Sequence, residues 1–259
     1  MNKRLVFLVL SLIASLVLFA GCAKEKPAGD VSLQKVLEKK TLVLGLDDAF
    51  PPMGFRNENN EIVGFDIDVA REVCRRLGVE LVPQPIDWNA KEQELNTGKI
   101  DCIWNGFTIT PARQEQLNFT EPYVANAQVL VVKADVPIAK LSELAGKQVG
   151  LQAGSSAADA LEAAVEFKDN LTALMDLEAR GVDAVVMDLL VANDNIARAG
   201  KAYRILEERL APEEYGVGFR KGDQALRDAV QAQLSAMAQD GSLAEIATRW
   251  FGADITIVK

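Results

Sequence analysis

The sequence predicts an α/β protein of two lobes, and three observations lead to this prediction. Segments with strand character alternate with segments of helical periodicity from Thr41 onward, which is typical of α/β architecture. The run Ile100–Trp104 is apolar without alternation, as expected of a strand buried on both faces of a sheet. A strand, a small-residue turn and a helix start follow one another again from Gln148 to Ala157. Two groups of such units indicate two lobes with a cleft between them.

The expected strands are short runs bounded by turn residues. They are Thr41–Leu46, Glu80–Pro83, Ile100–Trp104, Val129–Val132, Gln148–Gln152, Asp183–Met187, Tyr203–Leu206 and Tyr215–Phe219. The expected helices have an apolar stripe, a capping residue before them or a glycine after them. They begin near Asp66, Asn89, Pro111, Leu141, Ala157, Leu171, Leu189, Asp223 and Ser242. Ser242 and Glu245 have the spacing of a capping box, and Asp66 is expected to cap the helix that follows it.

The amino terminus has the parts of a secretory signal peptide. Lys3 and Arg4 precede an apolar run, Leu5–Phe19, which is short for a transmembrane helix. Ala20-Gly21-Cys22 follows and resembles a bacterial lipobox, in which the cysteine is lipidated and becomes the mature first residue. We therefore expect a signal peptide at 1–21, lipidation of Cys22, a tether at 22–37 and an extracytoplasmic, membrane-anchored protein. An uncleaved anchor or a plainly cleaved signal are the alternatives.

Composition excludes some classes of partner. The chain has 259 residues, 28 basic and 37 acidic side chains and no histidine, so its formal charge is −9. An acidic chain without a long basic run argues against nucleic acid. If Cys22 is lipidated, Cys74 and Cys102 remain; with no histidine they do not make a metal site, and no cofactor is expected. Both are expected to be core residues, although export would permit a disulfide.

Three turns at strand ends are candidates for a binding site. In Asn105–Arg113, Gly106 permits close approach to the backbone, Thr108 offers a hydroxyl, and Arg113 offers a fork of donors that fits a carboxylate. Arg113 could also be a solvated helix residue. Gly154-Ser155-Ser156 before a helix is either an anion site or an ordinary N-cap. Asp188, at the end of an apolar strand, either caps the next helix or faces a ligand.

Six segments in order resemble the extracytoplasmic amino-acid-binding proteins of ABC transporters, which have the type II periplasmic-binding-protein fold. The resemblance runs from about Thr41 to Gly252. The segments are GFDID at 64–68, GFTITPAR at 106–113, EPY at 121–123, VGLQAGSS at 149–156, VDAVVMD at 182–188 and YGVGFRKGD at 215–223.

The resemblance implies a site for a free amino acid. Arg113 would bind the α-carboxylate, and Asp188, from the other lobe, the α-ammonium. The other residues that it places around the ligand are Gly106, Thr108, Ser155 and Ser156 at the main-chain end of the ligand, Phe50 and Trp88 as flanking rings, Asp47 at the side-chain end, and Phe107 and Gln152 on the rim.

The family further implies the organisation and partners of the chain. Residues 38–125 with 217–259 would form lobe 1 and 126–216 lobe 2, joined by a two-stranded hinge near Tyr123–Gln128 and Pro212–Gly218. The expected protein is a monomer that delivers its ligand to permease subunits and is not an enzyme. The alternatives are an enzyme similar to cyclohexadienyl dehydratases, with Asp47 or Asp48 as the acid or base, and a ligand-sensing module. Asp47 and Asp48 favour a polar or cationic ligand side chain, whereas the rings would equally suit cystine.

Overall fold

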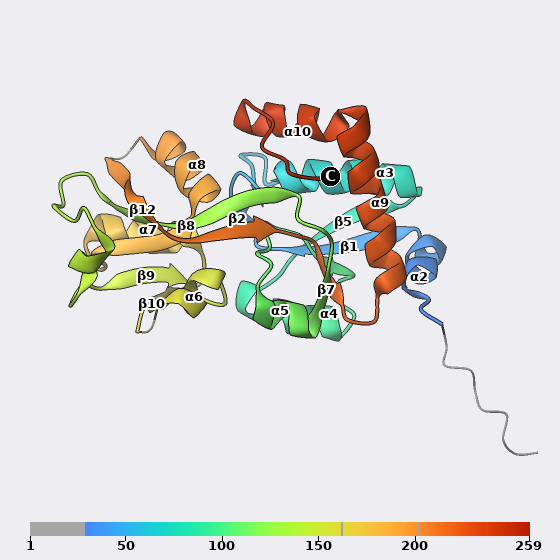
Figure 1. Cartoon of the computed structure of the whole chain (residues 1–259), viewed down its shortest axis with the longest axis horizontal. Helices are drawn as coiled ribbons and strands as arrows, with labels where there is room; N and C mark the ends of the chain where they lie inside the picture. Colours follow the sequence, from blue (N-terminus) through green and yellow to red (C-terminus); the bar gives the residue numbers. More distant parts are fainter. Residues whose placement is uncertain (1–28, 162, 201) are drawn as a thin grey trace, which may run out of the picture.

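Two five-stranded sheets form the centres of two lobes (Figure 1). The computed structural model describes residues 29–161, 163–200 and 202–259. The sheet of lobe 1 has the strand order β5-β1-β6-β13-β7 and that of lobe 2 the order β10-β9-β11-β8-β12. In lobe 1 the strands are β1 (Thr41–Leu46), β5 (Glu80–Pro85), β6 (Cys102–Ile103), β7 (Leu117–Phe119) and β13 (Gly218–Arg220). In lobe 2 they are β8 (Val124–Lys133), β9 (Val149–Gln152), β10 (Val165–Phe167), β11 (Ala184–Asp188) and β12 (Tyr203–Tyr215).

Helices surround both sheets. Those of lobe 1 are α2 (Ser32–Lys39), α3 (Phe65–Leu77), α4 (Lys91–Asn96), α5 (Pro111–Gln116), α9 (Gln224–Asp240) and α10 (Ser242–Phe251), with a short 3-10 helix at Trp88–Ala90. Lobe 1 also carries a small antiparallel sheet of β2 (Ala49–Phe50), β3 (Gly54–Arg56) and β4 (Ile62–Val63). The helices of lobe 2 are α6 (Ser156–Ala160), α7 (Asn170–Ala179) and α8 (Leu189–Ala199), with a 3-10 helix at Leu141–Leu144.

The chain crosses between the lobes along β8 and β12. These long strands pair antiparallel, from Tyr215 opposite Val124 to Tyr203 opposite Lys133, and run from one lobe into the other (Figure 1). The sequence predicted separate strands at Tyr203–Leu206 and Tyr215–Phe219, but β12 is continuous through Pro212 to Tyr215, and β13 begins at Gly218. A proline is tolerated there because β12 is the edge strand of its sheet.

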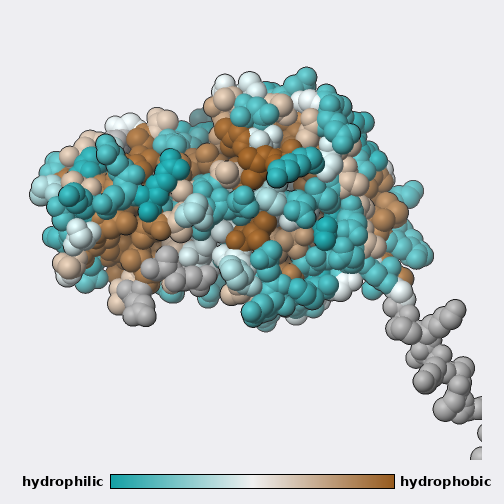
Figure 2. Space-filling view, in the orientation of Figure 1, coloured by the Kyte–Doolittle hydropathy of each residue, from teal (hydrophilic) through white to brown (hydrophobic). Residues whose placement is uncertain are grey.

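The strand at the centre of each sheet leads into a helix, as predicted. Thr110 caps α5 by accepting a hydrogen bond from the Arg113 N–H at 3.2 Å, with Pro111 as the first helical residue. The buried side chains in both lobes are mainly aliphatic and aromatic, and hydrophilic residues cover most of the face shown in Figure 2. The α/β architecture of both lobes therefore follows from the strand–helix pattern that the sequence carries.

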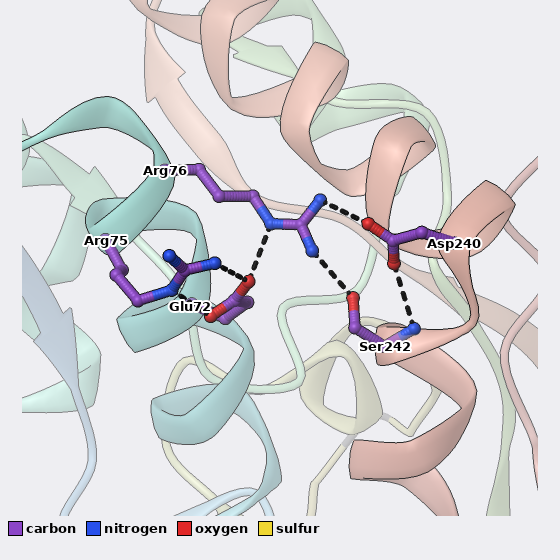
Figure 3. A network of polar contacts seen from close by, with 5 residues as sticks. All are labelled: Glu72, Arg75, Arg76, Asp240 and Ser242. Carbon is purple, nitrogen blue, oxygen red and sulfur yellow. Dashed lines mark hydrogen bonds and ion pairs between the residues drawn. The ribbon is translucent and has the colours of Figure 1, made fainter.

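Two capping predictions were wrong. α10 has Gly241 at its N-cap position, and the Ser242 hydroxyl accepts a hydrogen bond from Arg76 on α3 at 2.9 Å instead (Figure 3). Arg76 also contacts Asp240 at 2.8 Å and Glu72 at 2.7 Å, so a charged network competes for the serine. α3 likewise has Gly64, not Asp66, at its N-cap position.

The start of the described chain also differs from expectation. α2 begins at Ser32, inside the segment 22–37 expected to be a tether, and its Val36 is buried. The Ser32 hydroxyl accepts a hydrogen bond from the Leu226 N–H on α9 at 3.1 Å, which ties α2 to lobe 1. The signal peptide and Cys22 lie outside the described residues. No helix in the described ranges is both long and apolar enough to cross a membrane. Cys74 and Cys102 are buried with free thiols.

Candidate functional site

A narrow cleft, nearly closed by its own side chains, lies where β1, β6, β9 and β11 end, between the two lobes. Ligands bind beside the carboxyl ends of strands in open α/β sheets. All the predicted ligand-binding residues except Phe107 line this cleft, together with Asn105. The lining residues are Asp47, Phe50, Trp88, Asn105, Gly106, Thr108, Arg113, Gln152, Ser155, Ser156 and Asp188.

Arg113 spans the cleft from lobe 1. Its Nη1 donates to the Thr108 carbonyl at 2.9 Å and its Nη2 to the Gly154 carbonyl of lobe 2 at 3.1 Å. The guanidinium carbon lies 4.7 Å from the ring centroid of Phe107, within the range of a cation–π contact. Two carbonyls and a ring therefore fix the guanidinium in the cleft wall, which contradicts the alternative of a solvated helix residue.

Phe107 is placed differently from the prediction. Its side chain is fully buried, 5.7 Å from the ring of Trp88 between centroids, and forms the floor under Arg113. Gly106 explains the direction of this side chain, because its φ of +54° turns the chain sharply before Phe107. A Cβ at Gly106 would come within 2.9 Å of the Phe50 ring, so this position requires glycine.

Asp188 is the buried carboxylate of lobe 2. Its Oδ1 accepts hydrogen bonds from Tyr215 Oη at 2.6 Å and Asn126 Nδ2 at 2.7 Å. Although Asp188 occupies the N-cap position of α8, its side chain makes no capping hydrogen bond. Burial and the nearby charge of Glu213 raise the pKa of Asp188 to about 7. Of the two readings of the sequence, the structure supports a carboxylate that faces the cleft.

The opposite end of the cleft contains Asp47 and Gln152. Gln152 Nε2 donates to Asp47 Oδ2 at 2.7 Å across the cleft, and Asn170 Nδ2 donates to Gln152 Oε1 at 3.2 Å. Burial raises the pKa of Asp47 to about 6. Asp48, the other acidic residue of this loop, pairs with Arg56 and is absent from the cleft lining. This part of the cleft is therefore polar and acidic, and the Phe50 and Trp88 rings also line the cleft.

The small residues at the helix starts supply further polar groups. Ser156 Oγ lies 3.4 Å from Thr108 Oγ1, which joins the two lobes. Among the described residues, the buried Ser155 hydroxyl has no hydrogen-bond partner, and it faces the cleft. The Gly106 N–H donates to Asp66 Oδ2 at 2.6 Å, so this donor is committed to the protein itself. Of these polar groups, the Ser155 hydroxyl is therefore the one that its described neighbours leave without a hydrogen bond.

Sequence reasoning missed the supports behind the site. Glu213 on β12 accepts hydrogen bonds from Gln128 at 2.9 Å and Asn126 at 3.1 Å, and lies 3.3 Å from the Thr108 hydroxyl. Asn105 Oδ1 accepts from the Asp47 N–H at 3.0 Å. Asn105 is the first residue of the turn that the sequence analysis identified as a candidate site. Glu213 lies in a stretch that the sequence suggests is exposed, and no pattern there predicts a role in the site.

The comparisons identify the family of the chain. The model of the bacterial extracellular solute-binding proteins, family 3, matches residues 42–253. The chain therefore belongs to this family, which confirms the expectation drawn from the six segments.

Individual relatives match over most of their length. The L-cystine-binding protein TcyJ of Escherichia coli (strain K12) is 31% identical over 252 residues, which are 94% of this chain and 95% of that protein. The histidine-binding periplasmic protein of Salmonella typhimurium is 30% identical over 232 residues, 82% of this chain and 88% of that protein.

Solved structures agree in fold. An ABC uptake transporter substrate binding protein from Streptococcus pneumoniae with bound histidine has a TM-score of 0.84 and 34% identity, covering 88% of this chain and 99% of that chain. Tv2483 bound to L-arginine has a TM-score of 0.85 and 33% identity, covering 89% and 98%. These likenesses confirm the type II fold class.

Proposed function

We propose that this chain is the substrate-binding component of an amino-acid ABC importer. It captures a free L-amino acid between its lobes and delivers it to the permease in the membrane. The observation that carries the proposal is the placement of Arg113 and Asp188, from different lobes, in the wall of one cleft. Its relatives include proteins named for binding cystine and histidine and structures with bound arginine and histidine.

The charges of the site match a zwitterion. An α-amino acid carries a carboxylate and an ammonium a few atoms apart, and both must be paired when they leave water. Arg113 would receive the carboxylate, with Ser155 and Ser156 from lobe 2, while Asp188 would receive the ammonium. Because each lobe contributes one charge, the ligand would stabilise the closed arrangement over an open one.

The acidic end of the cleft favours a polar or cationic ligand side chain. Asp47 and Gln152 face that end, with the Phe50 and Trp88 rings available to flank an extended chain. Arginine, lysine and glutamine fit this chemistry, and cystine remains a candidate because its second half is itself a zwitterion. We propose no reaction at Asp47, since the relatives are solute-binding proteins.

A thermal-shift panel of the common L-amino acids and L-cystine tests the proposal. A ligand at a hundredfold excess over its Kd should stabilise the protein by about 2.7 kcal/mol. Arg113→Ala should then weaken binding of the preferred amino acid by about 30- to 3000-fold, since truncating one partner of a buried charge pair costs roughly 2–5 kcal/mol. Arg113→Lys should recover only part, because an ammonium lacks the two-point fork.

The control for this test alters the ligand. Amidation of the α-carboxylate should weaken binding to wild type strongly and to Arg113→Ala much less. A far-UV spectrum and a cooperative ligand-free melt show that the variant folds. No stabilisation by any amino acid, or binding by Arg113→Ala within about threefold of wild type, would refute the amino-acid clamp.

We further propose that the protein is a monomer held at the membrane through Cys22. The lobe bounds expected from the sequence, 38–125 plus 217–259 and 126–216, are part of this proposal, with α2 (Ser32–Lys39) added to lobe 1. The lipobox-like sequence supports the anchor. Expression of the full chain in a bacterium, followed by fractionation, should leave wild type with the membranes and release Cys22→Ser. Equal release of both proteins would contradict lipidation.

A further inference from the structure

Lys91 is a buried cation beside the cleft. It begins α4 in lobe 1 and its side chain is only 3% exposed. Its Nζ donates to the Trp88 carbonyl at 3.2 Å, lies 3.3 Å from Glu92 Oε1 and is 5.2 Å from the Trp88 ring centroid. A buried ammonium is costly unless it is paired, so these contacts hold a charge that water would otherwise solvate. Lys91 is not among the residues that line the ligand cleft.

The shortest described contact of Lys91 crosses to lobe 2. Its Nζ donates to the Gly154 carbonyl at 2.8 Å, and Arg113 Nη2 donates to the same oxygen at 3.1 Å. A carbonyl oxygen has two lone pairs, and here each is taken by a cation of lobe 1. Hydrogen bonds that involve a charged group are shorter and stronger than neutral ones. One backbone carbonyl of lobe 2 is thus held by two charged side chains of lobe 1.

The turn around Gly154 fits closely against the start of α4. Gly154 has a φ of +69°, and a Cβ there would lie 3.1 Å from the Asn89 Cα and 3.3 Å from the Lys91 Nζ. No larger residue fits without displacing the segment of lobe 1. Ser155 and Ser156 follow directly and line the ligand cleft. The turn that carries both serines therefore lies directly against Asn89 and Lys91 of lobe 1.

Resting on the proposed function, we propose that Lys91 is a positioning residue: it fastens the Gly154–Ser156 turn to lobe 1 when the cleft closes and slows ligand release without touching the ligand. The bond to Gly154 joins two lobes, so it exists only in the closed arrangement. An interaction made in one of two states shifts the population toward that state. Since a ligand between the lobes leaves when they separate, the effect appears in the dissociation rate.

Lys91→Met tests the proposal, because methionine keeps an unbranched apolar stem against Trp88 and removes the donor and the charge. The matched control is Lys99→Met, which removes the same charge from the same lobe; Lys99 is an exposed partner of Glu94. The probes are L-arginine, L-histidine and L-cystine, with association and dissociation rates measured on the full chain. Lys91→Met should dissociate about 5- to 30-fold faster, with an association rate within about twofold of wild type. Lys99→Met should match wild type in both rates.

Rescue separates positioning from a general loss of structure. Lys91→Arg keeps the charge and can donate to the same carbonyl, so it should dissociate within about threefold of wild type. Where Lys91→Met lacks a cooperative ligand-free melt, Lys91→Gln takes its place and should also dissociate faster. A dissociation rate of the folded variant within about twofold of wild type overturns the role of Lys91 and leaves the proposed function standing. If wild type binds none of the probes or the common amino acids, the proposed function fails, and this role fails with it.

Discussion

Asp66 and Asp188 are buried aspartates with closely similar surroundings, one in each lobe. Each accepts a hydrogen bond at Oδ1 from a fully buried tyrosine: Tyr123 Oη lies 2.8 Å from Asp66, and Tyr215 Oη lies 2.6 Å from Asp188. Burial raises the pKa of both carboxyls to about 7. By composition, burial and pKa alone, the two residues would be assigned the same role.

Their remaining contacts separate them. Asp66 Oδ2 accepts from the Gly106 N–H at 2.6 Å, so both of its oxygens hold parts of lobe 1 together beneath the turn at Gly106. At Asp188 the second described hydrogen bond, from Asn126 at 2.7 Å, reaches Oδ1 again, and the side chain lines the cleft. A raised pKa in this protein therefore marks burial, and access to the cleft is what separates Asp188, the proposed binding carboxylate, from the structural carboxylate of Asp66.

The largest expected difference is in ligand binding. Asp188→Asn keeps the shape of the side chain but leaves a ligand ammonium without its countercharge, and should weaken binding by about 30- to 3000-fold. Asp66→Asn should bind within about threefold of wild type, because an amide can accept from Gly106 and donate to a reoriented Tyr123 hydroxyl. Calorimetric titration with the preferred amino acid measures both.

An analogue of the ligand without its α-amino group is the control. It should bind Asp188→Asn about as well as wild type. Equal losses of affinity in the two asparagine variants would remove the distinction between the residues.

The second prediction concerns pH. A ligand ammonium needs the Asp188 carboxylate, whose pKa is about 7 before binding. Below pH 7 a proton must leave when the ligand binds, so affinity should fall by up to about tenfold per pH unit below 7 and be flat above it. Asp188→Asn should lose this slope, and Glu213→Gln should move it to lower pH because a neighbouring negative charge is gone.

Titrations between pH 5 and 8, in buffers of different ionisation enthalpy, count the released protons. Asp47 has a pKa raised to about 6 and adds its own dependence for a cationic ligand, so the glutamine variant at position 213 isolates the Asp188 contribution. The same Kd at pH 5.5 and pH 8 would contradict this prediction.

The third prediction concerns stability without ligand. Asp66→Ala leaves the Gly106 N–H and the Tyr123 hydroxyl buried without an acceptor, at about 1–3 kcal/mol each, and should lower the free energy of unfolding accordingly. Asp188→Asn should leave the free energy of unfolding unchanged or raise it. A binding site without the countercharge of its ligand is not optimised for stability. Denaturant unfolding of the ligand-free proteins compares them.

The pH dependence of that stability has a defined sign. The folded-state pKa of Asp66, about 7, lies above its ordinary value of 3.8, so the folded protein holds the proton to higher pH than the unfolded chain. The contribution of Asp66 to the free energy of unfolding is therefore fully present below about pH 4 and is lost as the pH rises to 7. A variant with Asp66→Asn should lack that slope, and a slope equal to wild type would be evidence against the assignment.

The comparison also shows what the sequence could predict. The end of an apolar strand marked Asp188 as either a helix cap or a ligand-facing carboxylate, and the resemblance to amino-acid-binding proteins then assigned it to the ligand ammonium. Asp66 was taken for a helix cap because it stands before a helical stripe; its partners are Gly106 and Tyr123, 40 and 57 positions away, and sequence spacing does not reveal them. The sequence analysis did not predict Glu213 and Lys91 for the same reason, since their contacts depend on how the two lobes meet.

The smallest expected effects come from removing the hydroxyl groups of the two tyrosines, Tyr215 and Tyr123. Tyr215→Phe keeps the ring that packs near Gly106 and removes the hydroxyl that orients Asp188. One hydrogen bond contributes about 0.5–1.5 kcal/mol, so ligand binding should weaken by about 2- to 13-fold. Tyr123→Phe should leave Kd within about twofold of wild type and lower the ligand-free melting temperature, since its hydroxyl donates to Asp66.

Kd and melting temperature are measured for both variants, with Tyr203→Phe as a control because that hydroxyl donates to the Leu174 carbonyl in lobe 2. A larger change in Kd from Tyr123→Phe than from Tyr215→Phe would mean that Asp66 acts through the Gly106 turn on the ligand, and the two aspartates would then form one connected site.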